Sequence, residues 1–442
     1  MAMLRLLKDL TGLTYRQLES RARRCGDRLP RSTIASVLAR TTLPREEFTS
    51  ALVRACGLDP APWLTVHRGL ARQEEGQPVA RASVPPHQLP HCPSGLTGHD
   101  RELAALSELL SAADTPSPLA VISGPPGVGK SVLAMRAARR VAAHYPDGQL
   151  YVQLRGTTPD VEPLYPGEAA TRLLRSLSAP VPHLLSDASE TATMLRTVLA
   201  GRRMLILLDD AASAAQVRPL LPAGNRCAVL VTSRSNLTSL DGARSVQLRP
   251  LPPAEARTVL AQLLGPERVA LDPEAVTRLA ELCGRLPLCL RVVAARLAAR
   301  PCWPVAALVE RLADERHRLD ELSVDDLQIR ASLAVSYRAL PRTDEVARTA
   351  VRAFLLFGAL RLPETGTTLL ADLLKVSPRQ AESAVERLVD SHLLESTGPG
   401  RYRMLDLVRI FAGERAELEM ADEVAAACLA EHDPAPERTR VG

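Results

Sequence analysis

Residues 119–134 have the sequence Leu-Ala-Val-Ile-Ser-Gly-Pro-Pro-Gly-Val-Gly-Lys-Ser-Val-Leu-Ala. The first five are an apolar run typical of a buried strand, and the pattern G-x-x-x-x-G-K-[ST] follows. Gly124, Gly127 and Gly129 would let the main chain curl so that its N–H groups point at phosphate oxygens. The stretch predicts a strand, a phosphate-binding loop and a helix start. The alternative is a glycine-rich turn without a ligand.

The motif also predicts what two of the loop's side chains contact. Lys130 is expected to contact the β- and γ-phosphates, and Ser131 to offer its hydroxyl to Mg²⁺. Val128 and Val132 are expected to border the nucleotide. Only three of the 55 basic residues in the chain are lysines, yet this position holds one. A compact ammonium suits the cradle better than the wide arginine fork, so the choice favours phosphate binding.

Further apolar runs alternate with helical stretches, at 149–154, 204–208, 227–231 and 245–248. This alternation predicts a parallel α/β sheet. Asp209 and Asp210 follow the run at 204–208. Asp209 is expected to hold Mg²⁺, directly or through water, and Asp210 to orient an attacking water. Arg234 follows the run at 227–231 and is expected to point at the γ-phosphate.

Composition limits the class of protein. A length of 442 residues favours about three domains, and a hydrophobic content of 46% is enough for each domain to bury a hydrophobic core. The eight cysteines are scattered singly, which argues against a disulfide framework and against a zinc site. No apolar run is long enough to span a membrane, and no leader pattern is present. We therefore expect a cytoplasmic protein with no membrane partner.

The basic character is concentrated at the N-terminus. Residues 1–72 hold thirteen arginines and lysines against six acidic residues, while the whole chain has a net charge of +5. Such a charge distribution is typical of a module that meets nucleic-acid phosphates, although a solvated basic face has the same composition.

Residues 3–72 are predicted to form five short helices, the first with an apolar stripe of Leu4, Leu7 and Leu10. The third would turn Ile34, Val37 and Leu38 inward. Four residues near its start would project outward, as in a helix that reads bases in the major groove of DNA. These four are Arg31, Ser32, Thr33 and Ser36.

This region resembles the XRE-type helix-turn-helix of bacterial regulators, including the stretch L-P-R-E-E-F-T-S-A-L-V-R-A-C-G-L-D-P-A-P-W-L that ends at Leu64, in which Trp63 would close the core. The turn at 23–28 is longer than usual for the family. The resemblance implies DNA as a partner of residues 1–72. A protein-contact adaptor and a purely structural helical scaffold are the alternatives. Residues 73–95 are proline-rich and predict a tether that lets its neighbours move independently.

Residues 96–415 resemble the NB-ARC module of STAND-class NTPases. The resemblance rests on the P-loop, on T-G-H-D-R-E-L at 97–103, on V-T-S-R at 231–234 and on C-G-R-L-P-L at 283–288. It implies ATP or ADP and Mg²⁺ as cofactors, with His99 on the adenine side, Arg234 as a sensor and Pro287 packed on the adenine.

The same resemblance divides the chain. It implies a P-loop nucleotide-binding domain at 96–251, a helical ARC1 subdomain at 252–325 and a winged-helix ARC2 subdomain at 326–415. In ARC2 a helix would open at 376–380 and a wing strand would cover 401–404. A DNA-reading winged helix is the alternative for this part. An acidic helix and a polar tail are expected at 416–442, without internal repeats.

Two positions depart from the family. His99 stands where the family usually has arginine, and Leu405 where it has a histidine that contacts the β-phosphate of ADP. Leucine cannot donate a hydrogen bond, so the hold on ADP would be weaker unless groups such as Arg403 or Arg409 replace it.

The fold class is therefore multidomain, α and α/β. The function indicated is a DNA-binding transcriptional regulator controlled by an ATP/ADP switch, with slow hydrolysis at most. Self-association in the ATP state and a separate sensor protein are the further partners considered. The alternatives are a signalling NTPase whose N-terminal domain recruits a protein, and a nucleotide-stabilised scaffold without turnover.

Overall fold

The computed structural model describes residues 2–39, 44–74, 85–92, 98–112, 117–158, 161–179, 188–224, 226–325 and 327–431. The chain separates into two compact units, residues 1–84 and residues 85–442.

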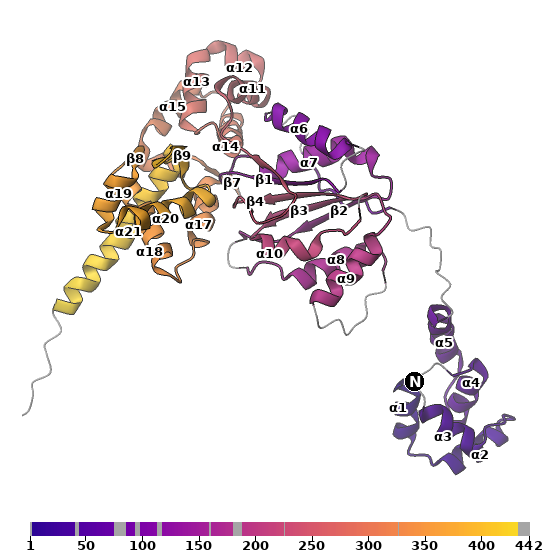
Figure 1. Cartoon of the computed structure of the whole chain (residues 1–442). Helices are drawn as coiled ribbons and strands as arrows, with labels where there is room; N and C mark the ends of the chain where they lie inside the picture. The colour runs from indigo at the N-terminus through magenta and orange to yellow at the C-terminus, as the bar shows by residue number, and fades with distance from the viewer. Residues whose placement is uncertain are drawn as a thin grey trace, which may run out of the picture. The chain divides into compact units, whose positions relative to one another are not determined.

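The first unit is entirely helical in its described part (Figure 1). Its helices are α1 (Ala2–Thr11), α2 (Tyr15–Arg24), α3 (Arg31–Ala39), α4 (Glu46–Ala55) and α5 (Ala61–Glu74). Helix α2 begins at a capping box, in which Thr14 and Gln17 satisfy each other's main-chain N–H groups. The predicted stripe on α1 is wrong at one position. Leu4 and Leu7 are buried, but Leu10 is 77% exposed, because steps of three residues drift around a helix of 3.6 residues per turn.

Helix α3 has the orientation that its sequence predicts. Ile34 and Leu38 are buried in the core of the unit, and Val37 packs against that core. The four outward residues are all exposed: Arg31, Ser32, Thr33 and Ser36.

The long turn between α2 and α3 is held by a contact to α4. Arg54 donates two hydrogen bonds to the carboxylate of Asp27, at 3.1 and 2.9 Å. The main-chain N–H of Asp27 also donates to the Ala22 carbonyl at 2.9 Å. These contacts give the extended turn a defined path from α2 into α3.

The second unit contains a five-stranded parallel sheet with the order β2-β3-β4-β1-β5. Alternate residues of β3 point to opposite faces of the sheet. Leu205 and Leu207 belong to the core that includes α7, and Ile206 and Leu208 belong to the core that includes α8 and α9. Helices α6 and α7 cover one face, and α8, α9 and α10 cover the other (Figure 1). The predicted sheet is confirmed. The strands are β1 (Leu119–Ser123), β2 (Gln149–Gln153), β3 (Leu205–Ala211), β4 (Ala228–Ser233) and β5 (Arg244–Gln247). The helices of this part are α6 (Asp100–Ser111), α7 (Lys130–Val141), η1 (Ala142–His144), α8 (Pro166–Ser176), α9 (Ala188–Leu199), α10 (Ala214–Val217) and η2 (Arg218–Leu220).

Strand β3 continues beyond its apolar run. Its register with β4 shifts between Leu208 and Ala211, and Asp210 has a left-handed backbone with φ of 58°. The two aspartates therefore lie in an irregular strand end, which aims successive side chains differently from a regular pleat.

Part of the predicted tether is fixed to the sheet. Residues 85–92 run along the edge strand β2, where Gln149 N–H donates to the Pro86 carbonyl at 2.6 Å and Gln88 N–H donates to the Gln149 carbonyl at 3.0 Å. The prediction of a free tether was wrong for this stretch, because β2 is an edge strand whose main-chain groups need partners. Residues 75–84 and 93–97 of the predicted linker lie outside the described residues.

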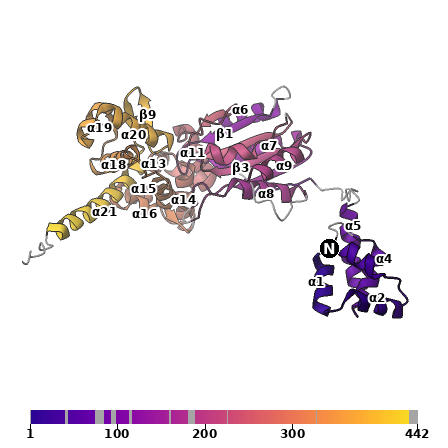
Figure 2. The same ribbon diagram turned by 60° about the horizontal axis from the view of Figure 1, so that its bottom comes forward.

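The rest of the second unit is mainly helical. A capping box at Ser377 opens α20, and Arg401–Arg403 form the middle strand of an antiparallel sheet with the order β8-β10-β9, so both local predictions are confirmed. Helices α18, α20 and α21 pack together (Figure 2). No described helix is long and apolar enough to cross a membrane.

The first group of elements is α11 (Pro253–Leu264), α12 (Pro266–Leu271), α13 (Pro273–Leu282), α14 (Pro287–Ala298), α15 (Val305–Ala313), α16 (Glu315–Glu321), β6 (Ser323–Val324) and β7 (Leu327–Gln328). The second group is α17 (Ile329–Arg338), α18 (Glu345–Ala359), β8 (Glu364–Gly366), α19 (Thr367–Leu374), α20 (Pro378–Asp390), β9 (Glu395–Gly398), β10 (Arg401–Arg403) and α21 (Asp406–Glu431).

The last helix differs from its prediction. Instead of a separate acidic helix after residue 415, α21 runs without a break from Asp406 to Glu431. Its first turns are held by burial of Leu407, Val408 and Phe411 in the core, so the helix starts where the wing strand ends.

Candidate functional site

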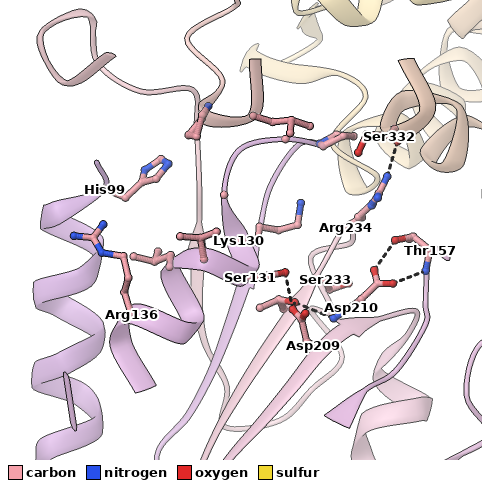
Figure 3. A pocket seen from close by; sticks show the side chains of 18 of the residues that line it. His99, Lys130, Ser131, Arg136, Thr157, Asp209, Asp210, Ser233, Arg234 and Ser332 are labelled. Atoms are coloured by element: carbon pink, nitrogen blue, oxygen red, sulfur yellow. Dashed lines mark hydrogen bonds between the residues drawn. The ribbon is translucent and has the colours of Figure 1, made fainter. Parts of the chain in front are cut away.

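A cavity of about 500 Å³ lies at the carboxyl ends of β1, β3 and β4. Ligands of open α/β sheets bind at this edge. In Figure 3, His99 and Arg136 stand at one end of the cavity, Thr157 and Arg234 at the other, and Lys130 lies between them. The predicted site residues that line it are His99, Gly127, Gly129, Lys130, Ser131, Val132, Asp209, Asp210, Arg234 and Pro287. Gly124 and Val128 are not among its lining residues.

The backbone of the P-loop requires its glycines. Gly124 has φ of 149°, and a Cβ there would lie 2.7 Å from the Leu248 carbonyl oxygen. Gly129 has φ of 98° at the start of α7. Val128 is fully buried beneath the loop, and its carbonyl oxygen lies 3.0 Å from Nε2 of His99. Gly124 and Val128 therefore shape the loop from below.

Lys130 is held inside the loop by main-chain oxygens. Its Nζ donates to the carbonyls of Gly124 at 2.8 Å and Pro125 at 3.0 Å. Burial, and secondarily the positive charge of Arg234, lower the pKa of Lys130 to about 7. A nearby anion would reverse this effect, because opposite charge favours the ammonium form.

Asp209 and Ser131 are brought together as predicted. Ser131 Oγ donates to Asp209 Oδ1 at 2.7 Å, and the Thr232 hydroxyl donates to the same oxygen at 2.5 Å. The Tyr151 hydroxyl donates to Oδ2 at 3.2 Å. Burial and the Asp209 charge raise the pKa of Tyr151 well above its ordinary value, so the phenol stays a donor. A carboxylate and a hydroxyl oxygen next to a phosphate-binding loop are ligands that suit Mg²⁺.

Asp210 lines the cavity but is also bonded to a loop. Thr157 N–H donates to Oδ2 at 3.0 Å, and the Thr157 hydroxyl donates to Oδ1 at 2.5 Å. Both carboxylate oxygens are thus engaged with the β2–α8 loop. The role of orienting a water stays a prediction.

Arg234 lines the cavity, and its guanidinium group is bonded to helix α17. Nη1 donates to the Ser332 carbonyl at 2.6 Å and to the Ser336 hydroxyl at 2.8 Å (Figure 3 draws the first contact). Burial lowers the pKa of Arg234 from its ordinary value. Contact of Arg234 with the γ-phosphate stays a prediction, and its bonds to α17 are contacts that the sequence did not reveal.

Helix α14 packs on the P-loop at the position of Pro287. Leu288 N–H donates to the Gly127 carbonyl at 3.1 Å, and a Cβ at Gly129 would lie 3.7 Å from the Pro287 ring. Arg291, one turn later, also lines the cavity. Sequence reasoning missed it, although the four-residue spacing from Pro287 places both on one helix face.

Arg136 is a second cation that sequence reasoning missed. It lines the cavity near His99 and donates from Nη1 to the Gly98 carbonyl at 2.8 Å. Thr97 of the predicted adenine-side segment lies outside the described residues.

Leu405 lies away from this cavity. It lines a separate cavity of about 340 Å³, which also contains Pro125 and Pro126 of the P-loop. The two groups that could have replaced the family histidine are already engaged, because Arg403 donates to Glu395 and Arg409 donates to Glu315.

A different histidine, His392, lies beside Gln247 of strand β5. His392 is buried, its Nδ1 is 3.3 Å from Nε2 of Gln247, and its Nε2 has no hydrogen-bond partner among the described residues. Burial and the charge of Lys130 lower the pKa of His392 to about 4, so its ring is neutral at ordinary pH.

Comparison with known proteins identifies the region around the cavity. Residues 99–263 match the NB-ARC domain family. The chain is 41% identical over 345 residues to the regulatory protein AfsR of Streptomyces coelicolor, covering 77% of this chain and 34% of the relative. It is 39% identical over 375 residues to the AfsR protein of Streptomyces griseus, covering 83% of this chain and 38% of the relative. The chain thus spans little more than a third of the length of these relatives.

Solved structures were matched as well. The ORC2 protein of Aeropyrum pernix, solved in ADPNP and ADP complexes, matches with a TM-score of 0.42 and 17% identity, over 75% of this chain and 97% of that one. A STAND protein with a tetratricopeptide repeat sensor from Pyrococcus horikoshii matches with a TM-score of 0.35 and 16% identity, over 79% of this chain and 47% of that one.

Proposed function

We propose that this chain, whose residues 99–263 match the NB-ARC domain family, is a regulatory protein whose conformation is set by whether ATP or ADP occupies the cavity. The observation that carries the proposal is the 2.7 Å contact between Ser131 and Asp209 beside the half-buried ammonium of Lys130. A cation, a hydroxyl and a carboxylate in this order are the groups that phosphoryl-transfer sites use.

The residues along the cavity would contact different parts of the nucleotide. Lys130 and the loop N–H groups would hold the β- and γ-phosphates, while His99, Arg136 and Pro287 would border the base and sugar. Mg²⁺, when bound, neutralises phosphate charge, and Ser131 and Asp209 would hold it. In hydrolysis a water oxygen bonds to the γ-phosphorus as the bridging P–O bond breaks, which gives ADP and inorganic phosphate. The water is the group that Asp210 would orient.

The same contacts would couple nucleotide to conformation. We assign residues 96–251 to the nucleotide-binding domain, 252–325 to ARC1 and 326–415 to a winged-helix ARC2. ARC1 contacts the P-loop through Leu288 and Pro287, and α17 contacts Arg234, which follows β4 and lines the same cavity. A change in the bound phosphates at Lys130 would therefore act on both subdomains.

The first unit would bind DNA. This part of the proposal is supported by its excess of basic residues and by the exposed row of Arg31, Ser32, Thr33 and Ser36 on α3. Both curated relatives are called regulatory proteins.

Nucleotide binding is tested by denaturing the purified chain, identifying any released nucleotide, and titrating ATP and ADP. Lys130→Ala should lower affinity about ten- to a hundredfold, because a charge-assisted hydrogen bond contributes roughly 1.5–3 kcal/mol. Lys8→Ala is the matched control, since Lys8 pairs with Asp9 on the surface of the first unit. Equal affinities in the two variants would refute the assignment of the cavity.

A further inference from the structure

A second cavity, of about 410 Å³, adjoins the nucleotide cavity. Thr157, Thr158 and Arg234 line both. The far side of the second cavity is formed by Arg338 at the end of α17 and by Ser391 just after α20. The second cavity therefore begins where the phosphate end of the nucleotide cavity stops.

Arg234 and α17 form the partition between the two cavities. The guanidinium group is fixed by its bonds to the Ser332 carbonyl and the Ser336 hydroxyl. Ser332 lines the nucleotide cavity and Ser336 lines the second one. One arginine side chain thus presents positive charge to both spaces.

The lining of the second cavity has the chemistry of an anion site. It contains two arginines and five hydroxyl-bearing residues, and the described lining residues include no carboxylate. The side chains of Thr158, Ser235 and Arg338 make no hydrogen bond within the described part of the chain. Unpaired donors and an arginine fork suit a small tetrahedral oxyanion such as phosphate.

We propose that the second cavity binds the inorganic phosphate released from ATP, with Arg234 on the inner side and Arg338 on the outer side. The inference rests on the proposed function, because hydrolysis at the neighbouring cavity supplies the phosphate. Phosphate held there would keep Arg234 and α17 in contact with a product of the reaction. The conformation of the second unit would therefore respond to cleavage before phosphate leaves.

Equilibrium binding of labelled orthophosphate to the full chain saturated with ADP and Mg²⁺ tests the site directly. The wild type should bind one phosphate, and Arg338→Ala should weaken it by about tenfold while leaving ADP affinity unchanged. Arg348→Ala is the matched control, since Arg348 is an exposed arginine of α18 that lines neither cavity. It should leave phosphate affinity within about twofold of wild type. Thr158→Val should weaken phosphate binding to a smaller extent.

Single-turnover kinetics test the origin of the phosphate. Cleavage is followed by acid quench and release by a phosphate sensor. The wild type should release phosphate with a lag after cleavage, and Arg338→Ala should shorten the lag without changing the cleavage rate. Equal phosphate affinity in the two arginine variants, or release without a lag in the wild type, would overturn the inference while leaving nucleotide binding intact. Failure to bind ADP would instead overturn the proposed function and, with it, this inference.

Discussion

Arg234, just after β4, donates a hydrogen bond of 2.6 Å to the main-chain oxygen of Ser332 in α17, 98 residues along the chain. The same Nη1 also reaches the Ser336 hydroxyl at 2.8 Å. These bonds connect the edge of the sheet that borders the cavity with the first helix of the proposed ARC2 subdomain. The residue expected to detect the γ-phosphate is therefore also a structural link to α17.

Replacing Arg234 with alanine should loosen this link. The variant loses both bonds to α17, which are worth about 1.5–3 kcal/mol together because the donor is charged. We expect a lower melting temperature for the second unit and faster ADP release. Ser336→Ala keeps the bond to the Ser332 carbonyl and should show the smaller effect in both measurements. If Arg234→Ala released ADP at the wild-type rate, the link would not contribute to nucleotide retention.

Lys130 should make nucleotide binding depend on pH. Burial lowers its pKa to about 7, below the ordinary value of about 10.4 in an unfolded chain. Between these values the unfolded chain binds the additional proton, so the contribution of Lys130 to the free energy of unfolding rises with pH across that window. Phosphate favours the ammonium form, so ADP binding should take up a proton at about pH 8, and affinity should fall as the pH rises above about 7.

Calorimetry in two buffers of different ionisation enthalpy measures this proton uptake. Uptake should disappear in Lys130→Met and persist in Lys8→Met. Binding by the wild type at about pH 8 without proton uptake would show that Lys130 is already charged before nucleotide binds.

Asp209 and Asp210 should behave differently when each becomes asparagine. Asp209 accepts bonds from Ser131, Thr232 and Tyr151, so Asp209→Asn should weaken ATP binding mainly when Mg²⁺ is present. Among the described residues, the Asp210 carboxylate is bonded to Thr157 alone, so Asp210→Asn should leave binding near normal and slow turnover. ATP titrations with and without Mg²⁺, together with turnover rates, separate the two. Equal losses of affinity in both variants would contradict the division of roles.

The features that could be predicted from the sequence are those set by residues close together along the chain. The P-loop, the sheet and the helix start at 376–380 depend on residues a few positions apart, and all three were predicted. The bond from Arg234 to Ser332 and the 53-residue contact between Asp210 and Thr157 cross between elements. Such contacts leave no periodic signal in one sequence. The docking of residues 85–92 was missed for the same reason, since an edge strand accepts almost any extended backbone.

Arg31 should distinguish DNA reading from other roles of the first unit. It is exposed at the start of α3, so Arg31→Ala should cost about 1–3 kcal/mol on a specific DNA site if the side chain reads a base. A smaller, sequence-independent loss would indicate a phosphate contact. Arg23→Ala is the control, because Arg23 is exposed on α2 and pairs with Glu19. Binding is measured at several salt concentrations. No binding by residues 1–84 to a genomic pool at low salt would favour a protein partner for this unit.

Leu405 provides the last test, because the structure places it away from the nucleotide cavity. It packs against the main core of the second unit and lines the smaller cavity beside Pro125 and Pro126. Leu405 is half-buried, and the cavity is lined by apolar side chains together with the charged Glu281 and Arg285. A histidine there loses the apolar contacts of leucine and costs about 1–3 kcal/mol when the ring finds no partner. Leu405→His should therefore lower the melting temperature and leave the ADP release rate unchanged. Leu405→Met, which keeps an apolar side chain of similar volume, should change neither by much. Slower ADP release in Leu405→His would show that position 405 reaches the bound phosphates after all, and that the segment at 403–408 contacts the nucleotide when ADP is bound.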